Sequence, residues 1–275
     1  MSMNSFHARQ GGRQRDEKAA KPPVERHGLL RADALLVQRG LAASRTQAQR
    51  LIGEGRVFAD GKPVGKPSLE LPADAALTVQ ADDSDRYVSR GGLKLAGALA
   101  QTGLNAAAKT CLDVGQSTGG FTDCLLQAGA ARVVGVDVGH GQLHGKLKGD
   151  ARVSALEGIN CRALTAADLG DAMPAGGFDL IVGDVSFISM TLVLPQLPAL
   201  LAADGDLLLL VKPQFEVGPH NIGKGGIVRD PTLYRDVEGR FLDLARQLGL
   251  TAKAWLASPI TGGDGNREFF IWLKK

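Results

Sequence analysis

The stretch Asp113-Val114-Gly115-Gln116-Ser117-Thr118-Gly119-Gly120 decides the fold of this 275-residue chain. It ends an apolar run at 109–114 that predicts a buried strand, and a helical pattern follows at 121–128. A strand, a glycine-rich turn and a helix in this order are typical of open α/β sheets, which bind ligands at the carboxyl ends of their strands. The stretch therefore predicts both a sheet and a ligand site.

The glycine spacing distinguishes between possible ligands. A dinucleotide fold needs glycine at the middle position of GxGxxG, but Ser117 stands there, and the turn lacks the GK[ST] of a phosphate-binding loop. Asp137 ends the next predicted strand, where it can accept hydrogen bonds from both hydroxyls of a ribose. The pattern favours S-adenosylmethionine, a phosphate-free adenosine cofactor, over a nucleotide-dependent oxidoreductase, which is the alternative.

Further apolar runs continue the pattern towards the C-terminus. Strands are predicted at 132–137, 153–157, 178–183, 206–212, 252–256 and 268–273, and helices at 142–148, 189–203 and 232–248. Because the strands are continuously apolar and alternate with helices, we expect a mostly parallel seven-stranded sheet covered on both faces. We expect this domain, residues 93–275, to have an α/β fold of the Rossmann-like class I methyltransferase type.

The N-terminal third has a different organisation. Residues 1–28 are polar and basic, which predicts a disordered tail. Residues 29–82 predict a small α+β module: a helix from Leu29 that Gly40 stops, a helix at 45–53 capped by Ser44, and a hairpin at 56–64, followed by a strand at 77–79. Residues 83–92 are acidic, then basic, then glycine-rich, which predicts a linker.

Charge and composition narrow the function. Residues 1–70 carry 13 Lys and Arg against 7 Asp and Glu, whereas the rest of the chain is slightly acidic, so the front end suits a polyanion such as nucleic acid. The cysteines Cys111, Cys124 and Cys161 form no CxxC pair, which favours a reducing compartment and no metal site. Because no apolar run reaches the roughly 20 residues of a membrane span, we expect a cytoplasmic protein without membrane contact.

Four charged residues stand in apolar surroundings. Lys94 begins the apolar helix LKLAGALA, Asp184 and Lys212 follow buried strands, and Glu268 opens the last strand. Charges at the ends of buried strands are costly unless they are paired or functional. Any one of them could be a structural ion pair, but four around one predicted cofactor site favour catalysis.

The chain resembles the TlyA family, in which an S4 RNA-binding domain precedes an FtsJ-like 2′-O-ribose methyltransferase domain. The first domain matches in Arg31-x-Asp33, Ser44-Arg45-x-Gln47-Ala48 and Asp60-Gly61-Lys62-x-Val64. The second matches in SRGGLKL (89–95), LDVGQSTGGFTDCLL (112–126), VGVDVGHGQL (134–143), GDVSFIS (183–189), VKPQFE (211–216), KGGIVRD (224–230) and GNREFFIW (265–272). Departures are Gln116, His140 and Cys161, where the family is expected to have Ala, Tyr and Ala.

The resemblance implies a Lys-Asp-Lys-Glu catalytic tetrad at Lys94, Asp184, Lys212 and Glu268. Lys212 is expected to contact the 2′-hydroxyl and either take its proton or stabilise the developing oxyanion, with Asp184 positioning Lys212. The predicted cofactor-binding residues are Asp113, Gly115, Ser117, Thr118, Gly119, Gly120, Phe121, Asp137, Val138, Glu157, Asn160 and Asp184. The predicted RNA-binding residues are Arg31, Arg45, Gln49, Arg50, Lys62 and Arg90.

The leading hypothesis is S-adenosylmethionine-dependent 2′-O-methylation of ribose in ribosomal RNA or ribosomal subunits, and the resemblance alone implies that the nucleoside is cytidine. A catalytically silent RNA-binding assembly factor is the alternative, which the intact tetrad disfavours. A membrane-active haemolysin is a further alternative, which the absence of a predicted span disfavours. Nothing in the sequence demands more than a monomer.

Overall fold

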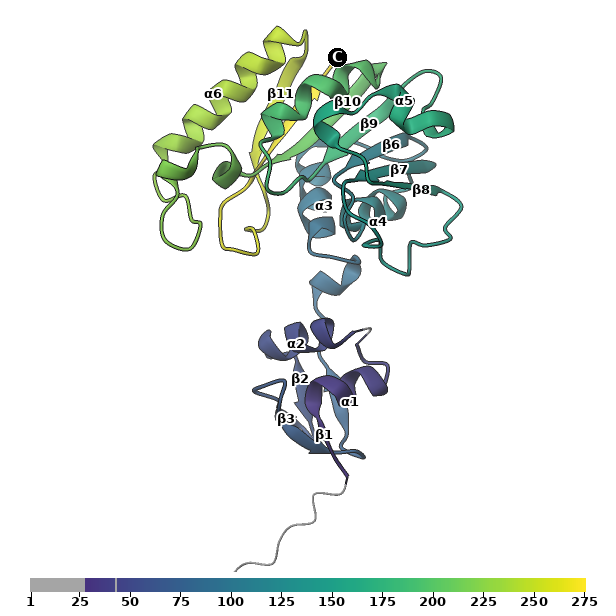
Figure 1. Ribbon diagram of the computed structural model, residues 1–275, viewed down its shortest axis with the longest axis vertical. Helices are drawn as coiled ribbons and strands as arrows, with labels where there is room; N and C mark the ends of the chain where they lie inside the picture. The colour runs from purple at the N-terminus through teal and green to yellow at the C-terminus, as the bar shows by residue number, and fades with distance from the viewer. Residues whose placement is uncertain (1–27, 43) are drawn as a thin grey trace, which may run out of the picture. The chain divides into compact units, whose positions relative to one another are not determined.

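The computed structural model describes residues 28–42 and 44–275 (Figure 1). The chain divides into two units between Ala81 and Asp82, which we describe separately. The basic tail predicted for residues 1–28 lies outside the described residues, apart from Gly28.

The N-terminal unit is the predicted small α+β module. Its elements are β1 (Leu29–Arg31), α1 (Ala32–Gln38), α2 (Arg45–Gly53), β2 (Val57–Ala59), β3 (Lys62–Pro63), β4 (Glu70–Pro72) and β5 (Leu77–Val79). β1 pairs antiparallel with β4, and β2 lies between β3 and β5. Apolar faces of α1 and α2 pack on these strands through Leu35, Leu36, Ala48, Leu51 and Val57.

One detail of this unit depends on a contact between distant segments, and a second is local. The predicted helix from Leu29 begins instead at Ala32, because residues 29–31 pair with β4, a strand that the sequence analysis missed. The predicted cap of α2 is present: the Ser44 hydroxyl accepts a hydrogen bond from the Gln47 amide at 3.2 Å.

The second unit contains the large sheet. Its strands are β6 (Thr110–Val114), β7 (Arg132–Asp137), β8 (Val153–Glu157), β9 (Phe178–Gly183), β10 (Leu201–Val211), β11 (Thr251–Ala257) and β12 (Phe269–Lys274). Its α-helices are α3 (Gly91–Thr102), α4 (Gly120–Gln127), α5 (Ala166–Leu169) and α6 (Thr232–Gln247). Short 3-10 turns occupy Asp83–Arg86, Cys161–Ala163, Gly170–Ala172, Met190–Leu192, Leu194–Ala199, Pro213–Phe215 and Pro219–Asn221.

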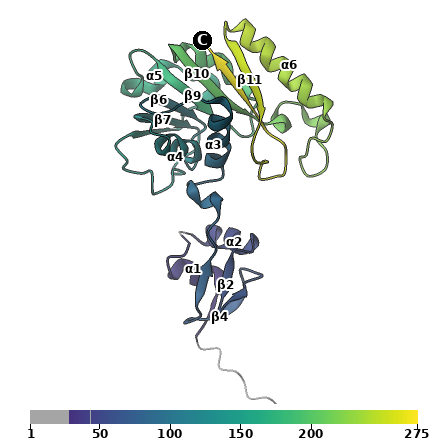
Figure 2. The same ribbon diagram turned by 180° about the vertical axis from the view of Figure 1, so that it is seen from behind.

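The strand order is β11-β12-β10-β9-β6-β7-β8, with β12 antiparallel to both neighbours and the other pairs parallel. The predicted mostly parallel, seven-stranded sheet is confirmed. Alternate residues of β6 face opposite layers: Leu112 and Val114 join the core cluster of α6, whereas Cys111 joins that of α3 and α4. Helices therefore cover both faces, as Figures 1 and 2 show from opposite sides.

Two predicted helices are wrong. Residues 142–148 form no helix: the glycines around them favour turns, and Leu143 and Leu147 are buried where a side chain on Gly119 would clash with them. Within residues 189–203, Pro195 and Pro198 lack the N–H that an α-helix needs, so only two short 3-10 turns form and β10 already begins at Leu201.

Residues 83–92, which we expected to link the domains, belong to the second unit. A 3-10 turn forms at Asp83–Arg86, Tyr87 is buried in the α3–α4 core cluster, and α3 begins at Gly91. In the described part of the chain, no helix is long and apolar enough to cross a membrane.

Candidate functional site

The loop between β6 and α4 is held close to the end of β9. Gly115 has φ +84°, and a Cβ at this position would lie 2.5 Å from the backbone oxygen of Asp184. Ser117 also adopts a left-handed conformation, with φ +48°. Glycine is therefore required at 115 on two counts, conformation and close approach, and the loop leads directly into α4.

Asp137, at the end of β7, organises the neighbouring loops. One carboxylate oxygen accepts a hydrogen bond from the Ser117 amide at 2.8 Å, and the other accepts one from the Gly139 amide at 2.7 Å. The Ser117 hydroxyl in turn donates to the Gln142 side chain at 3.0 Å. Asp137 is thus fixed beside the loop, as its position in the sequence predicts.

Two adjoining cavities meet at this loop. The larger, of about 510 Å³, is lined by Gly115, Ser117, Asp137, Val138, Gln142, Asn160, Cys161, Asp184, Val185, Ser186, Phe187 and Ile188. The smaller, of about 260 Å³, is lined by Ser89, Arg90, Gly91, Lys94, Gly115, Gln116, Ser117, Thr118, Gly120, Phe121, Asp184, Ser186, Thr261 and Gly263. Gly115, Ser117, Asp184 and Ser186 border both cavities, so these residues mark where the contents of the two would meet.

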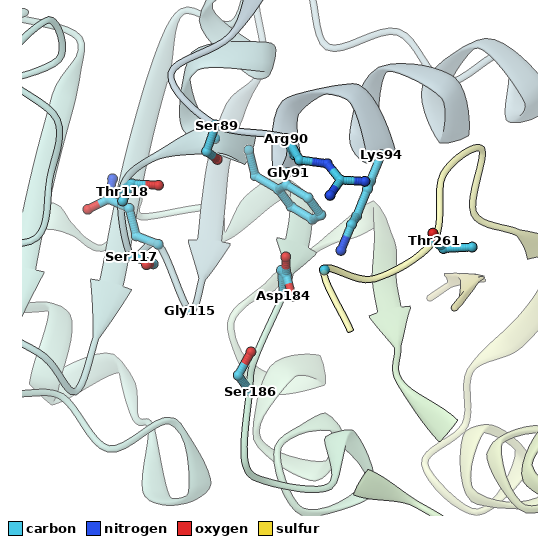
Figure 3. A pocket seen from close by; sticks show the side chains of 14 residues that line it. Ser89, Arg90, Gly91, Lys94, Gly115, Ser117, Thr118, Asp184, Ser186 and Thr261 are labelled. Atoms are coloured by element: carbon cyan, nitrogen blue, oxygen red, sulfur yellow. The ribbon is translucent and has the colours of Figure 1, made fainter. Parts of the chain in front are cut away.

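The two cavities differ in charge. Among the described residues that line the larger cavity, the charged ones are Asp137 and Asp184. The smaller cavity adds two cations, Arg90 and Lys94. Figure 3 shows Lys94, from α3, and Asp184, from the end of β9, reaching towards the same space. The acidic lining of the larger cavity suits a cationic ligand and disfavours phosphate.

The four predicted catalytic residues form two ion pairs. Lys212 Nζ lies 2.5 Å from Asp184 Oδ1, and Lys94 Nζ lies 2.6 Å from Glu268 Oε2. Lys212 also donates a hydrogen bond to the Ser186 hydroxyl at 2.7 Å. Burial raises the pKa of Glu268, while the nearby Lys94 and Lys212 lower it and Asp184 raises it, so the two pairs lie within electrostatic reach of each other.

The segment after β9 carries a strained aromatic residue. Phe187 has φ +64°, which is rare for a bulky side chain, and it is 92% exposed at the rim of the larger cavity. Its ring lies 5.6 Å from that of Phe215. Strain of this kind persists where the surroundings enforce it, and it is concentrated at functional sites.

A buried carboxylate fixes that segment. Glu216 accepts hydrogen bonds from the Ser189 hydroxyl at 2.6 Å and from the Met190 amide at 2.8 Å. Burial raises the pKa of Glu216 above its usual range, although both hydrogen bonds lower it. Two side chains that follow β10, Lys212 and Glu216, therefore hold the segment that carries Asp184, Ser186 and Phe187.

Asp113 lies behind the loop instead of at the cavity wall. It is buried and accepts a hydrogen bond from Thr122 at 2.7 Å, and Thr122 accepts one from Gln116 at 2.9 Å. Burial raises the pKa of Asp113 to about 7. Among the described residues, Asp113 lines neither of the two cavities. The side-chain amide of Gln116 donates inward to the Thr122 hydroxyl.

Two other predicted cofactor residues lie away from the cavities that contain the rest. Gly119 packs beneath the loop against Leu143 and Leu147. Glu157 accepts a hydrogen bond from the Gly141 amide at 2.8 Å and lines a separate hollow near β8. The structure brings together Gly115, Ser117, Thr118, Gly120, Phe121, Asp137, Val138, Asn160 and Asp184 around the two cavities.

The predicted RNA-binding residues fall into two groups. In the N-terminal unit, Arg31, Arg45 and Gln49 all donate hydrogen bonds to Asp33, while Arg50 and Lys62 are exposed elsewhere on its surface. In the second unit, Arg90 lines the smaller cavity.

Ser186, Phe187 and Glu216 belong to the site, although the sequence analysis does not predict them as site residues. They stand inside the motifs GDVSFIS and VKPQFE, but polarity and spacing alone do not separate them from ordinary loop residues. In residues 28–42 and 44–275, no three His, Cys, Asp or Glu side chains gather closely enough to hold a metal ion.

The chain is similar to known proteins over most of its length. Residues 87–275 match the family model for FtsJ-like methyltransferases, and residues 30–76 match the S4 domain. The chain is 48% identical to the 16S/23S rRNA (cytidine-2′-O)-methyltransferase TlyA of Mycobacterium tuberculosis over 244 residues, which is 89% of each chain. It is 33% identical to the 23S rRNA (cytidine-2′-O)-methyltransferase TlyA of Campylobacter jejuni, covering 87% of this chain and 97% of that one.

A solved structure of a hemolysin-named protein from Streptococcus thermophilus is 40% identical, with a TM-score of 0.70. The match covers 90% of this chain and 89% of that one.

Proposed function

The chain belongs to the TlyA family of FtsJ-like methyltransferases, and we propose that it transfers the methyl group of S-adenosylmethionine to a ribose 2′-hydroxyl of ribosomal RNA in the cytoplasm. Cytidine is the proposed target nucleoside because two relatives of this chain are named for cytidine-2′-O-methylation. The observation that carries the proposal is the ion pair between Lys212 and Asp184, because Asp184 borders both cavities.

The larger cavity fits this cofactor. Its volume of about 510 Å³ suits a nucleoside-sized ligand, and its charged lining residues, Asp137 and Asp184, suit a sulfonium cation that carries no phosphate. Gly115 leaves room that a Cβ would fill. Asp137 would hold the ribose of the cofactor, and Asp184, which borders both cavities, would face the cationic end. When bound, the cofactor supplies an already activated methyl group.

Lys212 is the proposed partner of the target 2′-oxygen. Because its amine lies beside Asp184 and donates to Ser186, it is held in one orientation. In that state it orients the hydroxyl and stabilises the negative charge that develops on the oxygen. Lys212 would thereby assist transfer of the methyl group of the cofactor to the oxygen, and the hydroxyl proton would pass to water.

The remaining residues would position the substrate. Lys94, which lines the smaller cavity and pairs with Glu268, would meet the phosphate beside the target ribose. Phe187 presents an exposed ring at the cavity rim, where an unstacked base could rest on it. A target nucleotide taken out of its stack would therefore find a cation and an aromatic surface next to Lys212.

Methyl transfer to purified ribosomal subunits tests the proposal directly. The substrate subunits come from cells that lack the corresponding gene, so that the target 2′-hydroxyl is unmodified. The full chain, labelled S-adenosylmethionine and either subunit are incubated, and the modified nucleotide is located by mass spectrometry of RNA fragments. We expect label on a ribose 2′-oxygen, at cytidine.

The result separates the competing functions. If neither subunit gains label while the chain still binds subunits, the protein is an RNA-binding assembly factor and the enzymatic proposal is wrong. Label on a base instead of a ribose would refute the 2′-O assignment alone.

A further inference from the structure

In the N-terminal unit, one buried carboxylate gathers three side chains. Asp33, at the start of α1, is 0% exposed. Arg31 donates to both of its oxygens, through Nε and Nη2 at 3.0 Å each, and Arg45 Nη2 and Gln49 Nε2 donate to Oδ2 at 2.9 and 3.0 Å. The hydrogen bond from Arg31, the largest effect, holds the pKa of Asp33 well below its usual range.

The donors themselves remain at the surface. The side chains of Arg31 and Arg45 are 46% and 58% exposed, and Gln49 is also exposed. A guanidinium has five N–H donors, and the carboxylate takes two from Arg31 and one from Arg45. Two guanidinium groups are therefore fixed side by side with donors to spare and a combined charge that Asp33 only half neutralises.

We propose that Arg31 and Arg45, fixed by Asp33, form a preassembled clamp for a phosphodiester of the RNA substrate. Guanidinium groups match the geometry of phosphate oxygens through paired hydrogen bonds, and RNA-binding proteins take much of their affinity from such contacts. A free arginine loses rotamer entropy when it binds, whereas these two are already ordered by the carboxylate. The inference rests on the proposed function, because it assumes that the substrate is RNA.

The clamp proposal and simple electrostatic attraction predict opposite effects of replacing Asp33 on RNA binding. Replacing Asp33 by asparagine adds one unit of positive charge, which by itself would tighten RNA binding. Under the clamp proposal the same change weakens binding, because the guanidinium groups lose the acceptor that orders them. Asp33 would then be a positioning residue of the interface, and the sign of the effect separates this role from bulk electrostatics.

Lysine substitutions test the clamp without changing the charge. Lysine keeps the cation but lacks the planar fork, so Arg31→Lys and Arg45→Lys should lose the paired contacts. Arg39→Lys is the matched control, since Arg39 is an exposed arginine that directly follows α1 in the same unit and donates to the Ala73 carbonyl instead of bonding Asp33.

The experiment measures binding of the fluorophore-labelled full chain to purified ribosomal subunits over a range of salt concentrations. We expect Arg31→Lys and Arg45→Lys each to weaken binding about tenfold, the loss of one charged hydrogen bond. Arg39→Lys should stay within about twofold, because its hydrogen bond goes to a backbone carbonyl of the same unit and the charge is kept. The slope of affinity against salt should not change, because the charge is conserved. Asp33→Asn, with its fold checked by thermal unfolding, should bind more weakly than wild type.

Three outcomes would overturn the clamp. These are an affinity of Arg45→Lys equal to that of Arg39→Lys, affinities of Arg31→Lys and Arg45→Lys equal to that of wild type, or a folded Asp33→Asn that binds as tightly as wild type or more tightly. The lysine variants decide the matter whatever the stability of Asp33→Asn. Failure of the proposed function looks different, because wild type would then transfer no methyl group to either subunit.

Discussion

Lys212 Nζ lies 2.5 Å from Asp184 Oδ1, although 28 positions of sequence separate the two residues. Asp184 directly follows β9 and Lys212 directly follows β10, and these strands are parallel neighbours whose register pairs Leu209 with Gly183. Because parallel strands end at the same edge of a sheet, the strand order alone brings the two charges together. The ion pair is thus a consequence of topology.

Lys212→Ala should lower the rate of methyl transfer about 10²–10⁴-fold, the range for a group that handles the reacting hydroxyl. Cofactor affinity should be retained, since Lys212 does not line the larger cavity. Single-turnover transfer and calorimetric titration of the cofactor measure the two effects. Lys148→Ala, at an exposed lysine, is the control. Full activity of Lys212→Ala would show that the mechanism is wrong.

Gly115→Ala should weaken cofactor binding by about tenfold or more, because its Cβ would lie 2.5 Å from the Asp184 backbone oxygen and the loop must shift. Gly103→Ala is the matched control: Gly103 has φ +70°, and nothing lies within 4 Å of its Cβ position. Because alanine is strained in the left-handed conformation, the free energy of unfolding of the control should fall by about 1 kcal/mol, and its cofactor affinity should not change. Equal affinities for the two variants would contradict the assigned role of Gly115.

Phe187→Ala should raise the KM for ribosomal subunits several-fold, in line with about 1 kcal/mol or more for a stacked base. The thermal stability should not fall, because the ring is 92% exposed and its backbone is strained. Val138→Ala offers the contrast, since Val138 is also exposed and lines the larger cavity on the Asp137 side. It should weaken cofactor binding instead. Unchanged subunit kinetics in Phe187→Ala would exclude the ring from substrate contact.

Asp113 should make the stability of the second unit depend on pH. Its pKa is raised from 3.8 to about 7, so the folded state holds a proton that the unfolded state has released between these values. The free energy of unfolding therefore falls as pH rises through this window, by on the order of a few kcal/mol. Asp113→Asn should remove this fall.

Hydrogen exchange in β6 and α4 at pH 5 and pH 8 measures the effect. Relative to wild type, Asp113→Asn should be more stable at pH 8 than at pH 5. If the stability difference between Asp113→Asn and wild type is the same at pH 5 and pH 8, the folded protein carries Asp113 ionised at both pH values. Thr122→Val controls for loss of the hydrogen bond without loss of the carboxyl group.

Much of the site follows from local sequence patterns. A buried apolar strand that ends in a polar residue places that residue at the sheet edge, so Asp137, Asp184 and Lys212 could be located from sequence alone. The glycine-rich loop could also be located from sequence, because a left-handed, closely packed turn such as that at Gly115 requires glycine.

Side-chain direction could not be predicted in the same way. Asp113 also ends a strand, yet it turns inward to Thr122, and Glu157 ends β8 but bonds the Gly141 amide away from the two cavities. Leu143 and Leu147 have helical spacing, but their burial against Gly119 depends on a segment more than 20 positions away. In each case the deciding partner comes from another part of the chain.

The glycine loop from Asp113 to Gly120 shows the division most directly. The sequence by itself determined that a strand, a turn and a helix form there, because periodicity and glycine content act over a few residues. Only the tertiary structure decided that Asp113 supports the loop from behind, that Asp184 closes over Gly115, and that Asp33 gathers Arg31 and Arg45. Burial, charge pairing and close approach are properties of segments brought together by folding, and no local pattern encodes them.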